Sequence, residues 1–352
     1  MTKSLKVLPL LFLLVTLFCS GEKTSKIPET LKPPIPEYIG KLANKTPGTF
    51  RLAFGSCSKI TLPQPIWRPI INSEPDLWLW LGDIIYADTE DMSEMRRQYD
   101  TQKSQPDYAE LRKKVPIIGV WDDHDYGLND GGKEYTKREE SQKELLDFLG
   151  ETPDSPRRKQ KGAYWSYTYG EGERQLKVLL LDTRYHRDTP SQDGDVLGEE
   201  QWAWLENELK SSTAAVNIIA SSIQVIAQEQ RFEKWENFPK ARKKLFETIK
   251  NSGAEGVIII SGDRHIAELS KVEDSSVSYP IYDLTSSGMT HVSNEPEHYP
   301  WTEPNRYRIG KQFRELNFGI VDIDWNAAKV SLIVCGPEGV AIKEDIELSK
   351  LK

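Results

Sequence analysis

The sequence predicts an α/β protein with more than one β-sheet. Segments with strand character and segments with helix character alternate through the middle of the chain, and the part from Val277 onward carries several strands. This combination favours an α/β architecture with more than one sheet. The chain has 352 residues, which is long enough for one large domain or two medium ones and for a sizeable buried core.

The first 21 residues predict an export signal. Lys3 and Lys6 precede an apolar run from Val7 to Phe18. This run is shorter than the ~20 residues that span a bilayer, but it suits an export signal. Cys19 follows directly and resembles the lipidation site of a bacterial lipoprotein, although Phe18 stands where a small residue is usual. The alternative is signal cleavage near Cys19, which would give a soluble secreted protein. We expect export to the cell envelope, the periplasm or the cell surface, and we prefer the lipid anchor.

Residues 22–48 predict an extended tether between the signal and the folded part. They are rich in Lys, Pro and Thr and carry no sustained periodicity. From Thr49 the pattern becomes globular, with no second linker and no internal repeat. A single domain is therefore expected over residues 49–352.

The first half of this domain alternates short apolar runs with polar segments. The apolar runs predict strands, and the polar segment 134–149 is interpreted as a helix because its apolar residues cluster at its end. In order, the predicted elements are a strand at 51–57, a short helix at about 65–72, a strand at 76–83, a helix at 92–112, a strand at 115–121 and the helix at 134–149.

Periodicity separates strands from helices in the second half. The stretch AYWSYTY alternates, with Trp165, Tyr167 and Tyr169 on one face, as a half-exposed strand does. KVLLLDTR is continuous instead and suits a strand covered on both faces. Apolar residues three and four positions apart predict helices around Trp202–Leu209 and Ala241–Ile249. Further strands are predicted at 215–225, 256–263, 317–324 and 327–335.

Four of the apolar strands end in polar residues. The four ends read Gly55-Ser56-Cys57, Gly82-Asp83, Trp121-Asp122-Asp123-His124 and Gly262-Asp263-Arg264-His265. In open α/β sheets the ligand lies beyond the carboxyl ends of the strands. If these strands run parallel, six side chains meet in one crevice, namely Cys57, Asp83, Asp123, His124, Asp263 and His265. Polar residues at the end of a single strand commonly form a solvated turn. Their recurrence at the ends of four strands is difficult to assign to solvated turns alone.

These residue types point to bound metal ions. Adjacent carboxylates such as Asp122 and Asp123 repel each other unless a cation or water offsets their charge. Carboxylates and imidazoles bind divalent and trivalent metals, and Cys57 or Tyr86 would add an anionic ligand. Two metals about 3.5–4 Å apart can clamp a phosphoryl oxygen and generate a nucleophilic hydroxide. Asp83, followed by Tyr86 three residues later, is the candidate to bridge them.

The charge balance limits the classes of partner. The formal net charge is −8, which argues against a nucleic-acid surface and against electrostatic docking on anionic lipid. A phosphorylated substrate would need local cations, and bound metals are one way to supply them. No protein partner can be inferred.

Three stretches carry a resemblance to a known family: GDIIYAD at 82–88, WDDHD at 121–125 and SGDRH at 261–265. They resemble the calcineurin-like metallophosphoesterase superfamily and, within it, the PhoD-like (alkaline phosphatase D) family. Three further stretches support the resemblance, namely FGSC at 54–57, LDTRYHR at 181–187 and LGEEQWAWL at 197–205. The similarity extends from Phe50 to about Val334.

The resemblance implies a metallo-dependent phosphatase-like, four-layer α/β/β/α sandwich in a single domain. It also implies hydrolysis of phosphomonoesters, phosphodiesters or both by a metal-bound hydroxide, without a covalent enzyme intermediate. The superfamily's usual site is rich in histidine, whereas this chain has five histidines and places Cys57, Asp123, Asp125 and Asp263 at motif positions. The PhoD-like family shows the same replacements. It is also similar to purple acid phosphatases in having a tyrosine three residues after the bridging aspartate, the position of Tyr86 in this chain. The resemblance therefore implies Fe(3+), with Ca(2+) or another divalent metal beside it.

The first expected metal is iron, held by Cys57, Asp83, Tyr86 and His265. For Cys57 the alternative is a disulfide with Cys335, the default pairing in an oxidising compartment. Tyr86 could instead only anchor its loop, and Asp83 could only cap a helix. We prefer the ligand role for all three, which leaves Cys335 as a free, buried thiol.

The second metal is expected at Asp123 and Asp263, whose oxygen ligands suit calcium better than imidazoles would. The alternative is that one of them only hydrogen-bonds a loop. His124 is interpreted as the catalytic acid, which protonates the leaving alkoxide or stabilises charge on the phosphoryl oxygens. Asp125 is expected to orient His124, and Asp122 only to cap or brace the turn.

The remaining candidates have less specific signals. Arg184 could contact the substrate phosphate, or it could form a structural ion pair with a nearby Asp. His291 and Asn129 are candidates for lining the pocket. The alternative function is a non-catalytic, calcium-binding surface lipoprotein that keeps the fold, and the presence of His124 counts against it. A serine esterase is disfavoured because no Gly-x-Ser-x-Gly stretch is visible.

Overall fold

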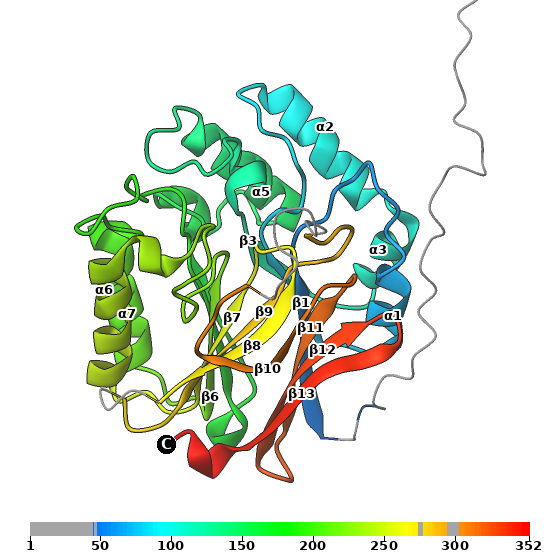
Figure 1. Ribbon diagram of the computed structural model, residues 1–352. Coiled ribbons are helices and arrows are strands. Elements are labelled where there is room, and N and C mark those ends of the chain that lie inside the picture. Colours follow the sequence, from blue (N-terminus) through cyan, green and yellow to red (C-terminus); the bar gives the residue numbers. More distant parts are fainter. Residues whose placement is uncertain (1–44, 46–47, 274–276, 294–302) are drawn as a thin grey trace, which may run out of the picture. The chain divides into compact units, whose positions relative to one another are not determined.

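The computed structural model describes residues 45, 48–273, 277–293 and 303–352 (Figure 1). The described residues belong to one compact unit. The predicted export signal at 1–21, including Cys19, lies outside the described residues, as does the predicted tether except for Lys45 and Gly48. Within the described part of the chain, no helix is long and apolar enough to cross a membrane.

The first sheet has six strands in the order β13-β12-β11-β1-β2-β3. β1, β2 and β3 run parallel to one another, and β11 pairs antiparallel with β1. The strands are β1 (Thr49–Gly55), β2 (Leu77–Leu81), β3 (Ile117–Val120), β11 (Phe318–Asp324), β12 (Lys329–Gly336) and β13 (Gly339–Glu347). The first three strands therefore meet the condition under which their carboxyl ends come to one edge of the sheet.

The second sheet has seven strands in the order β10-β8-β9-β7-β6-β5-β4. β5, β6, β7 and β9 are parallel, whereas β4 pairs antiparallel with β5. The strands are β4 (Trp165–Tyr169), β5 (Leu176–Leu180), β6 (Val216–Ser221), β7 (Val257–Ser261), β8 (Ala267–Val272), β9 (Ile281–Ser286) and β10 (Arg308–Phe313).

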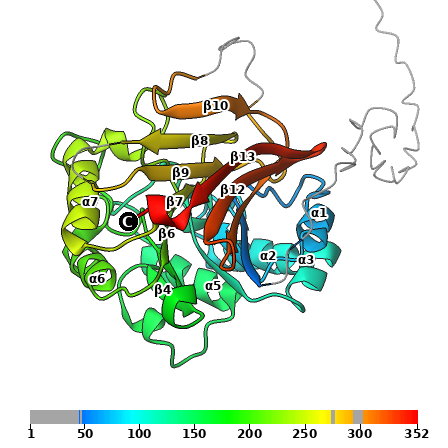
Figure 2. The ribbon, with the colours of Figure 1, turned by 90° about the horizontal axis from the view of Figure 1, so that it is seen from below.

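Helices cover the outer faces of the two sheets (Figure 2). The helices are α1 (Trp67–Asn72), α2 (Met92–Lys103), α3 (Pro106–Leu111), α4 (Asp123–Tyr126), α5 (Arg138–Leu149), α6 (Gly198–Lys210) and α7 (Pro239–Ser252). The short α4 differs from the others, because it lies at the carboxyl end of β3 and not on an outer face. The single helix predicted at 92–112 is two helices. Pro106 begins α3 at a position where a missing backbone N–H is harmless, whereas it would interrupt a continuous helix.

The strand β2 shows how the layers form from the sequence. All five residues of its LWLWL run are buried, and successive side chains point to opposite faces. Leu77 and Leu79 join the core between the sheets, whereas Trp78 and Trp80 join the core under α1 and α3. Trp67 of α1 packs edge-on against Trp78, with ring centroids 5.1 Å apart. Since α6 and α7 cover the other sheet in the same way, the predicted four-layer α/β/β/α sandwich is confirmed.

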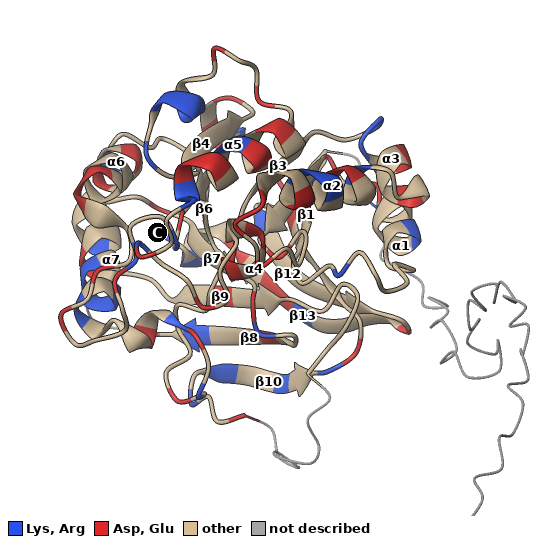
Figure 3. Cartoon of the chain, turned by 90° about the horizontal axis from the view of Figure 1, so that it is seen from above, with Lys and Arg blue, Asp and Glu red and all other residues tan. Residues whose placement is uncertain are grey.

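The carboxyl ends of the parallel strands in both sheets face the same side of the molecule. Seen from that side, acidic residues gather around α4 at the centre (Figure 3). Two glycines allow the strand ends to approach each other closely. A Cβ atom on Gly82, which has φ +86°, would lie 2.3 Å from the Asp122 nitrogen, and one on Gly262 would lie 2.9 Å from the Leu81 carbonyl oxygen. Because Gly262 has no side chain, the end of β7 can lie close to the end of β2. We call this line of contact between the two sheets the seam.

Candidate metal centre

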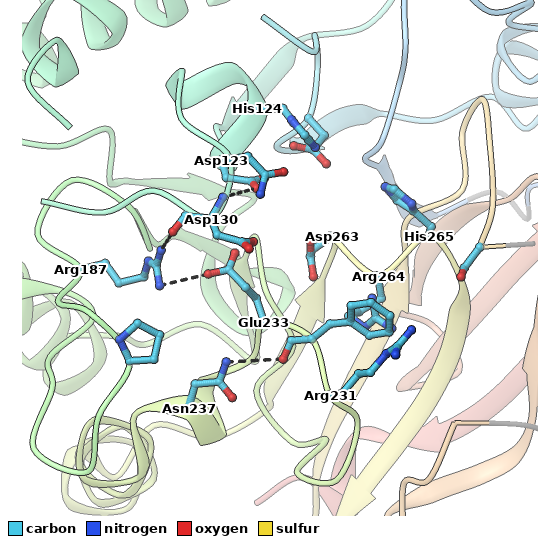
Figure 4. Close-up of a pocket in the computed structure, with 15 residues that line it drawn as sticks. Asp123, His124, Asp130, Arg187, Arg231, Glu233, Asn237, Asp263, Arg264 and His265 are labelled. Carbon is cyan, nitrogen blue, oxygen red and sulfur yellow. Dashed lines mark hydrogen bonds and ion pairs between the residues drawn. The ribbon is translucent and has the colours of Figure 1, made fainter. Parts of the chain in front are cut away.

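The six side chains predicted to meet do lie together at this seam. Cys57 follows β1, Asp83 follows β2, and Asp123 and His124 begin α4 just after β3, so one sheet supplies four of them. Asp263 and His265 follow β7 of the other sheet. All except Cys57 line a pocket of about 460 Å³ (Figure 4).

Three of these residues, together with Tyr86, form the first group of ligand atoms. The Cys57 thiol donates a hydrogen bond to Oδ2 of Asp83 at 3.3 Å. The Tyr86 hydroxyl lies 3.3 Å from the same oxygen and 3.1 Å from Nε2 of His265. The ligand atoms of Cys57, Asp83 and His265 fall within 4.8 Å of one another. This group has the composition expected for the first metal.

The second group is built from carboxylates. Ligand atoms of Asp122, Asp123 and Asp263 lie within 4.8 Å of one another, and so do those of Asp83, Asp123 and His124. Asp83 therefore belongs both to the thiol-containing group and to a group with Asp123 and His124, and Asp123 connects the latter to Asp263. This is the position that a bridging carboxylate would occupy.

Several of these carboxylates have a buried oxygen without a hydrogen-bond partner among the described residues. The oxygens are Oδ1 of Asp83, Oδ1 of Asp123 and Oδ2 of Asp263. An unpartnered buried carboxylate oxygen costs free energy, and a coordinated cation would satisfy it. The two groups also suit different metals, because thiolate and phenolate favour a transition metal whereas an oxygen-rich set suits calcium. The residues present therefore fit a pair of bound metals.

The backbone at these positions is strained. Cys57, Asp83, Asp263 and His265 have φ angles of 61°, 50°, 67° and 53°, in the left-handed region that favours glycine. A non-glycine residue held in such a region costs about 1–3 kcal/mol and persists where the surrounding structure enforces it. Four of the candidate ligands share this property, which is typical of a functional site.

Burial sets the protonation of the metal-free centre. It raises the pKa of Asp83, and the nearby charges of Asp123 and Asp122 raise it further. Burial likewise raises the pKa values of the Cys57 thiol and the Tyr86 hydroxyl, with Asp83 adding to both shifts. Burial lowers the pKa of His265 to about 3, so its imidazole is neutral and available as a ligand at ordinary pH. Bound cations would reverse the first three shifts.

His124 has a different partner from the one expected. Its Nδ1 lies 2.8 Å from a carboxylate oxygen of Asp88, and no hydrogen bond joins it to Asp125 among the described residues. Asp125 is buried, and its carboxylate accepts backbone N–H groups from Asp122, Asp83 and Ile84 at 2.6, 3.2 and 3.1 Å. This bonding turns the Asp125 side chain away from the imidazole, so it clamps the ends of β2 and β3 together.

Arg184 is fully buried under the pocket. Its Nε donates to Oδ1 of Asp122 at 2.6 Å, and its NH2 group lies 2.5 Å from Oε2 of Glu233. The position of Arg184 therefore agrees with the alternative, in which it forms a structural ion pair with a nearby Asp. Asp122 braces the turn, because it binds Arg184 and accepts a hydrogen bond from the Ser222 hydroxyl at 2.7 Å.

Four residues at the site were not predicted from the sequence: Asp88, which lies outside the pocket lining, and Asp130, Arg187 and Glu233, which line the pocket. Asp88 belongs to the GDIIYAD stretch, so a signal for it was present. Asp130 and Glu233 offer carboxylates within 4.8 Å of Asp123, and Arg187 lies 3.0 Å from Glu233 (Figure 4). Glu233 lies in a loop well beyond the end of β6, where no strand end marks it.

The lesser candidates lie at or near the pocket. Asn129 is part of its lining. Nε2 of His291 lies 3.2 Å from the Tyr86 hydroxyl, which places this imidazole beside the first group of ligands.

Cys57 and Cys335 are both buried and free, so the disulfide alternative is absent from this structure.

Two sheets between helices, with two groups of ligand atoms that share a carboxylate, define a metallophosphatase-like protein. A family model described as PhoD-like phosphatase matches residues 52–330. The chain belongs to this family. Alkaline phosphatase D of Bacillus subtilis (strain 168) is 24% identical over 306 residues, which cover 70% of this chain and 50% of that protein. The chain thus spans about half the length of that curated relative.

Solved structures share the fold at lower identity. A structure of PhoD has a TM-score of 0.70 at 18% identity, with 88% of this chain and 72% of that chain covered. A dimetal phosphatase from Danio rerio has a TM-score of 0.54 at 14% identity, with coverage of 85% and 99%. GAP50, described as the anchor in the inner membrane complex of Plasmodium, has a TM-score of 0.57 at 12% identity, with coverage of 85% and 89%.

Proposed function

We propose that this protein is an exported phosphoesterase that hydrolyses phosphomonoesters, phosphodiesters or both. Membership of the PhoD-like phosphatase family supports a metal-dependent phosphoester hydrolase. The observation that carries the proposal is the position of Asp83, which belongs to two adjacent ligand groups directly beside His124. Such a pair of sites is suited to a reaction at phosphorus.

In this proposal, iron is held by Cys57, Asp83, Tyr86 and His265. The short distances among the thiol, the phenol and the imidazole support it. Asp123 and Asp263, with Asp83 shared, hold calcium or another divalent ion, because this group offers mainly carboxylate oxygens. When bound, the metals supply activation of a water molecule and neutralisation of phosphoryl charge.

The chain's own residues orient the substrate and move a proton. His124 lines the pocket and protonates the leaving alkoxide. The pocket continues past the ligand groups to Pro190, Phe232 and Asn237, which leaves room for the organic part of an ester. Arg184 contributes indirectly, since its guanidinium fixes Asp122 next to Asp123.

The proposed location is the cell envelope, the periplasm or the cell surface, with lipid anchoring at Cys19 as the preferred form. The basic start and the apolar run of the first 21 residues support export. The tether at 22–48 would then separate the domain, at 49–352, from the membrane.

A non-catalytic binding protein is the competing function. GAP50 shares the fold and is described as an anchor, so the fold alone does not distinguish an enzyme from a binding protein. The site favours an enzyme, because a binding protein that only held calcium would have no use for the thiol, the phenol and the pocket-facing His124.

The test is metal content followed by activity. The protein is purified without chelator, analysed for iron and calcium, and assayed on 4-nitrophenyl phosphate and bis(4-nitrophenyl) phosphate. Iron near one per chain, with a divalent ion beside it, is expected. Asp83→Asn should remove the activity, whereas Asp345→Asn, on the exposed side of β13, should retain it. A folded Asp83→Asn variant with full activity would refute the proposal.

A further inference from the structure

We propose, building on the proposed function, that Asp88 is the residue that positions His124 to act as the acid. Asp88 does not line the pocket and belongs to none of the groups of candidate metal ligands. It acts through the imidazole alone. Its role is to fix which ring nitrogen faces the substrate and to hold the ring at that angle.

The contact between the two side chains defines the orientation of the ring. Nδ1 of His124 lies 2.9 Å from Oδ1 and 2.8 Å from Oδ2 of Asp88. A carboxylate accepts only, so the hydrogen in this contact is on Nδ1. Nε2 is then the nitrogen left for the pocket, which His124 lines, and in the acid form of the ring Nε2 carries the second hydrogen, which passes to the leaving alkoxide. A carboxylate behind one ring nitrogen commonly fixes the state and direction of a catalytic histidine.

The loop after β2 holds His124 at two further points. The backbone N–H groups of Ala87 and Asp88 both donate to the His124 carbonyl oxygen, at 3.2 and 3.3 Å. The ring of Tyr86 stacks against the imidazole with centroids 4.1 Å apart and planes inclined by 33°. Asp88 also has a φ of 42°, in the left-handed region, which the surrounding structure must enforce.

The geometry excludes Asp125 from this role. Both of its oxygens are occupied by backbone N–H groups of the neighbouring strand ends. Asp88 is therefore the carboxylate that binds the imidazole. Its side chain is 41% exposed, so water can reach the outer side of the Asp88–His124 pair. A partly exposed Asp88 can be replaced without opening a cavity in the core.

A purely structural role is the alternative, in which Asp88 only ties its loop to α4. The same loop offers a matched control in Asp91. Its side chain accepts the backbone N–H groups of Ser93 and Glu94 at 2.9 and 3.4 Å and caps α2. Asp91→Asn thus changes an acid to an amide a few residues away, with a structural consequence only.

The experiment compares two esters that differ in their need for an acid. A 4-nitrophenolate leaves without protonation, whereas an alkoxide needs a proton in the transition state. In Asp88→Asn, kcat for an alkyl phosphate should fall about 100-fold and kcat for the 4-nitrophenyl ester less than about 3-fold, since general acids contribute roughly 10²–10⁴-fold. KM should change little for either ester. Asp91→Asn should leave both kcat values unchanged.

A double variant separates positioning from an independent effect. If Asp88 acts through His124, Asp88→Asn added to His124→Ala should cause no further loss. Equal losses on both esters, an additive loss in the double variant, or no loss at all would overturn the proposal. Melting curves identify a variant that has lost its fold.

A measurement on the metal-free protein does not depend on catalysis. At a pH where the imidazole is neutral, nitrogen-15 NMR of histidine-labelled protein should show His124 with its hydrogen on Nδ1, and Asp88→Ala, which leaves no side-chain acceptor at this position, should remove this preference. An unchanged tautomer would contradict the proposal. Failure of the proposed function would look different, because the metal-loaded wild-type protein would then hydrolyse neither ester while the tautomer preference remained.

Discussion

Arg184 and Asp122 form an ion pair in which both side chains are 0% exposed, directly beneath the candidate metal centre. Glu233 approaches the same guanidinium at 2.5 Å. Arg184 thus pairs with two carboxylates from different loops, of which Glu233 also pairs with Arg187. Removal of one partner of a buried pair leaves an uncompensated charge, which is far more costly than the loss of a surface pair.

Arg184→Ala should therefore lower the free energy of unfolding by about 3–5 kcal/mol, as measured by denaturant unfolding. Arg68→Ala is the control, because Arg68 pairs with Asp107 at the surface and should change the free energy by less than about 1 kcal/mol. If Arg184 mainly bound substrate, its replacement would raise KM and leave the free energy of unfolding unchanged.

Added metal should stabilise the protein through Asp83. A metal at 100 times its dissociation constant stabilises the folded state by about 2.7 kcal/mol, so the melting temperature of the wild-type protein should rise. Asp83→Asn should melt at or above the temperature of the metal-free wild type, since it relieves repulsion among buried carboxylates, and metal should shift it little. A wild-type shift retained in Asp83→Asn would show that the metal binds elsewhere.

The two buried thiols should differ in their effect on metal content. Cys57→Ser should lose the first metal, because its thiol lies 3.3 Å from Asp83 among the candidate ligands. Cys335→Ser buries a hydroxyl in the core under α1 and α3, at a cost of about 1–3 kcal/mol, and should keep its metal. Elemental analysis of the two folded variants shows whether the loss of the first metal is specific to Cys57→Ser. Equal metal content would remove Cys57 from the ligand set.

A pH dependence is expected at Asp283, away from the pocket. Burial raises its pKa, although its carboxylate accepts the Ser261 hydroxyl and the N–H groups of Val225 and Ile226. The folded protein therefore holds this proton more tightly than the unfolded chain, and its stability falls as pH rises through the interval between the two pKa values. At neutral pH, Asp283→Asn should be more stable than the metal-free wild type.

This difference should disappear near the ordinary pKa of an aspartate, because the wild-type side chain is then protonated as well. Unfolding of both metal-free proteins at a series of pH values provides the measurement. A difference that does not vary with pH would mean that Asp283 does not titrate in this way.

Much of the fold follows from local patterns. The continuous run of β2 and the alternation of β4 are properties of short segments, and the structure contains both strands where the sequence predicts them. The break between α2 and α3 was missed because the polar pattern continues across it, although Pro106 marks the position. The pairing of β11 with β1 depends on segments far apart in the chain, which no local pattern reports.

The site was predictable where residues end strands, since parallel strands bring their carboxyl ends to one edge. The partner of His124 was not predictable in this way. Sequence proximity suggested Asp125. Its carboxylate, however, accepts hydrogen bonds from the backbone N–H groups of Asp83 and Ile84 and is therefore not available to His124. Likewise, the electrostatic partner of Arg184 is settled by which loops meet under the pocket, and Glu233 comes from a loop without regular structure.

The candidate ligands are divided between the two sheets. Cys57, Asp83 and Asp123 are present early in the chain, whereas Asp263 and His265 follow β7. During synthesis, a nascent chain that has not yet emerged past β7 can offer only part of each metal site, because each site lacks one ligand. Complete coordination thus becomes available only after β7 and the residues that follow it have docked beside β1, β2 and β3, which makes metal loading a late event in biogenesis and an indicator of correct assembly.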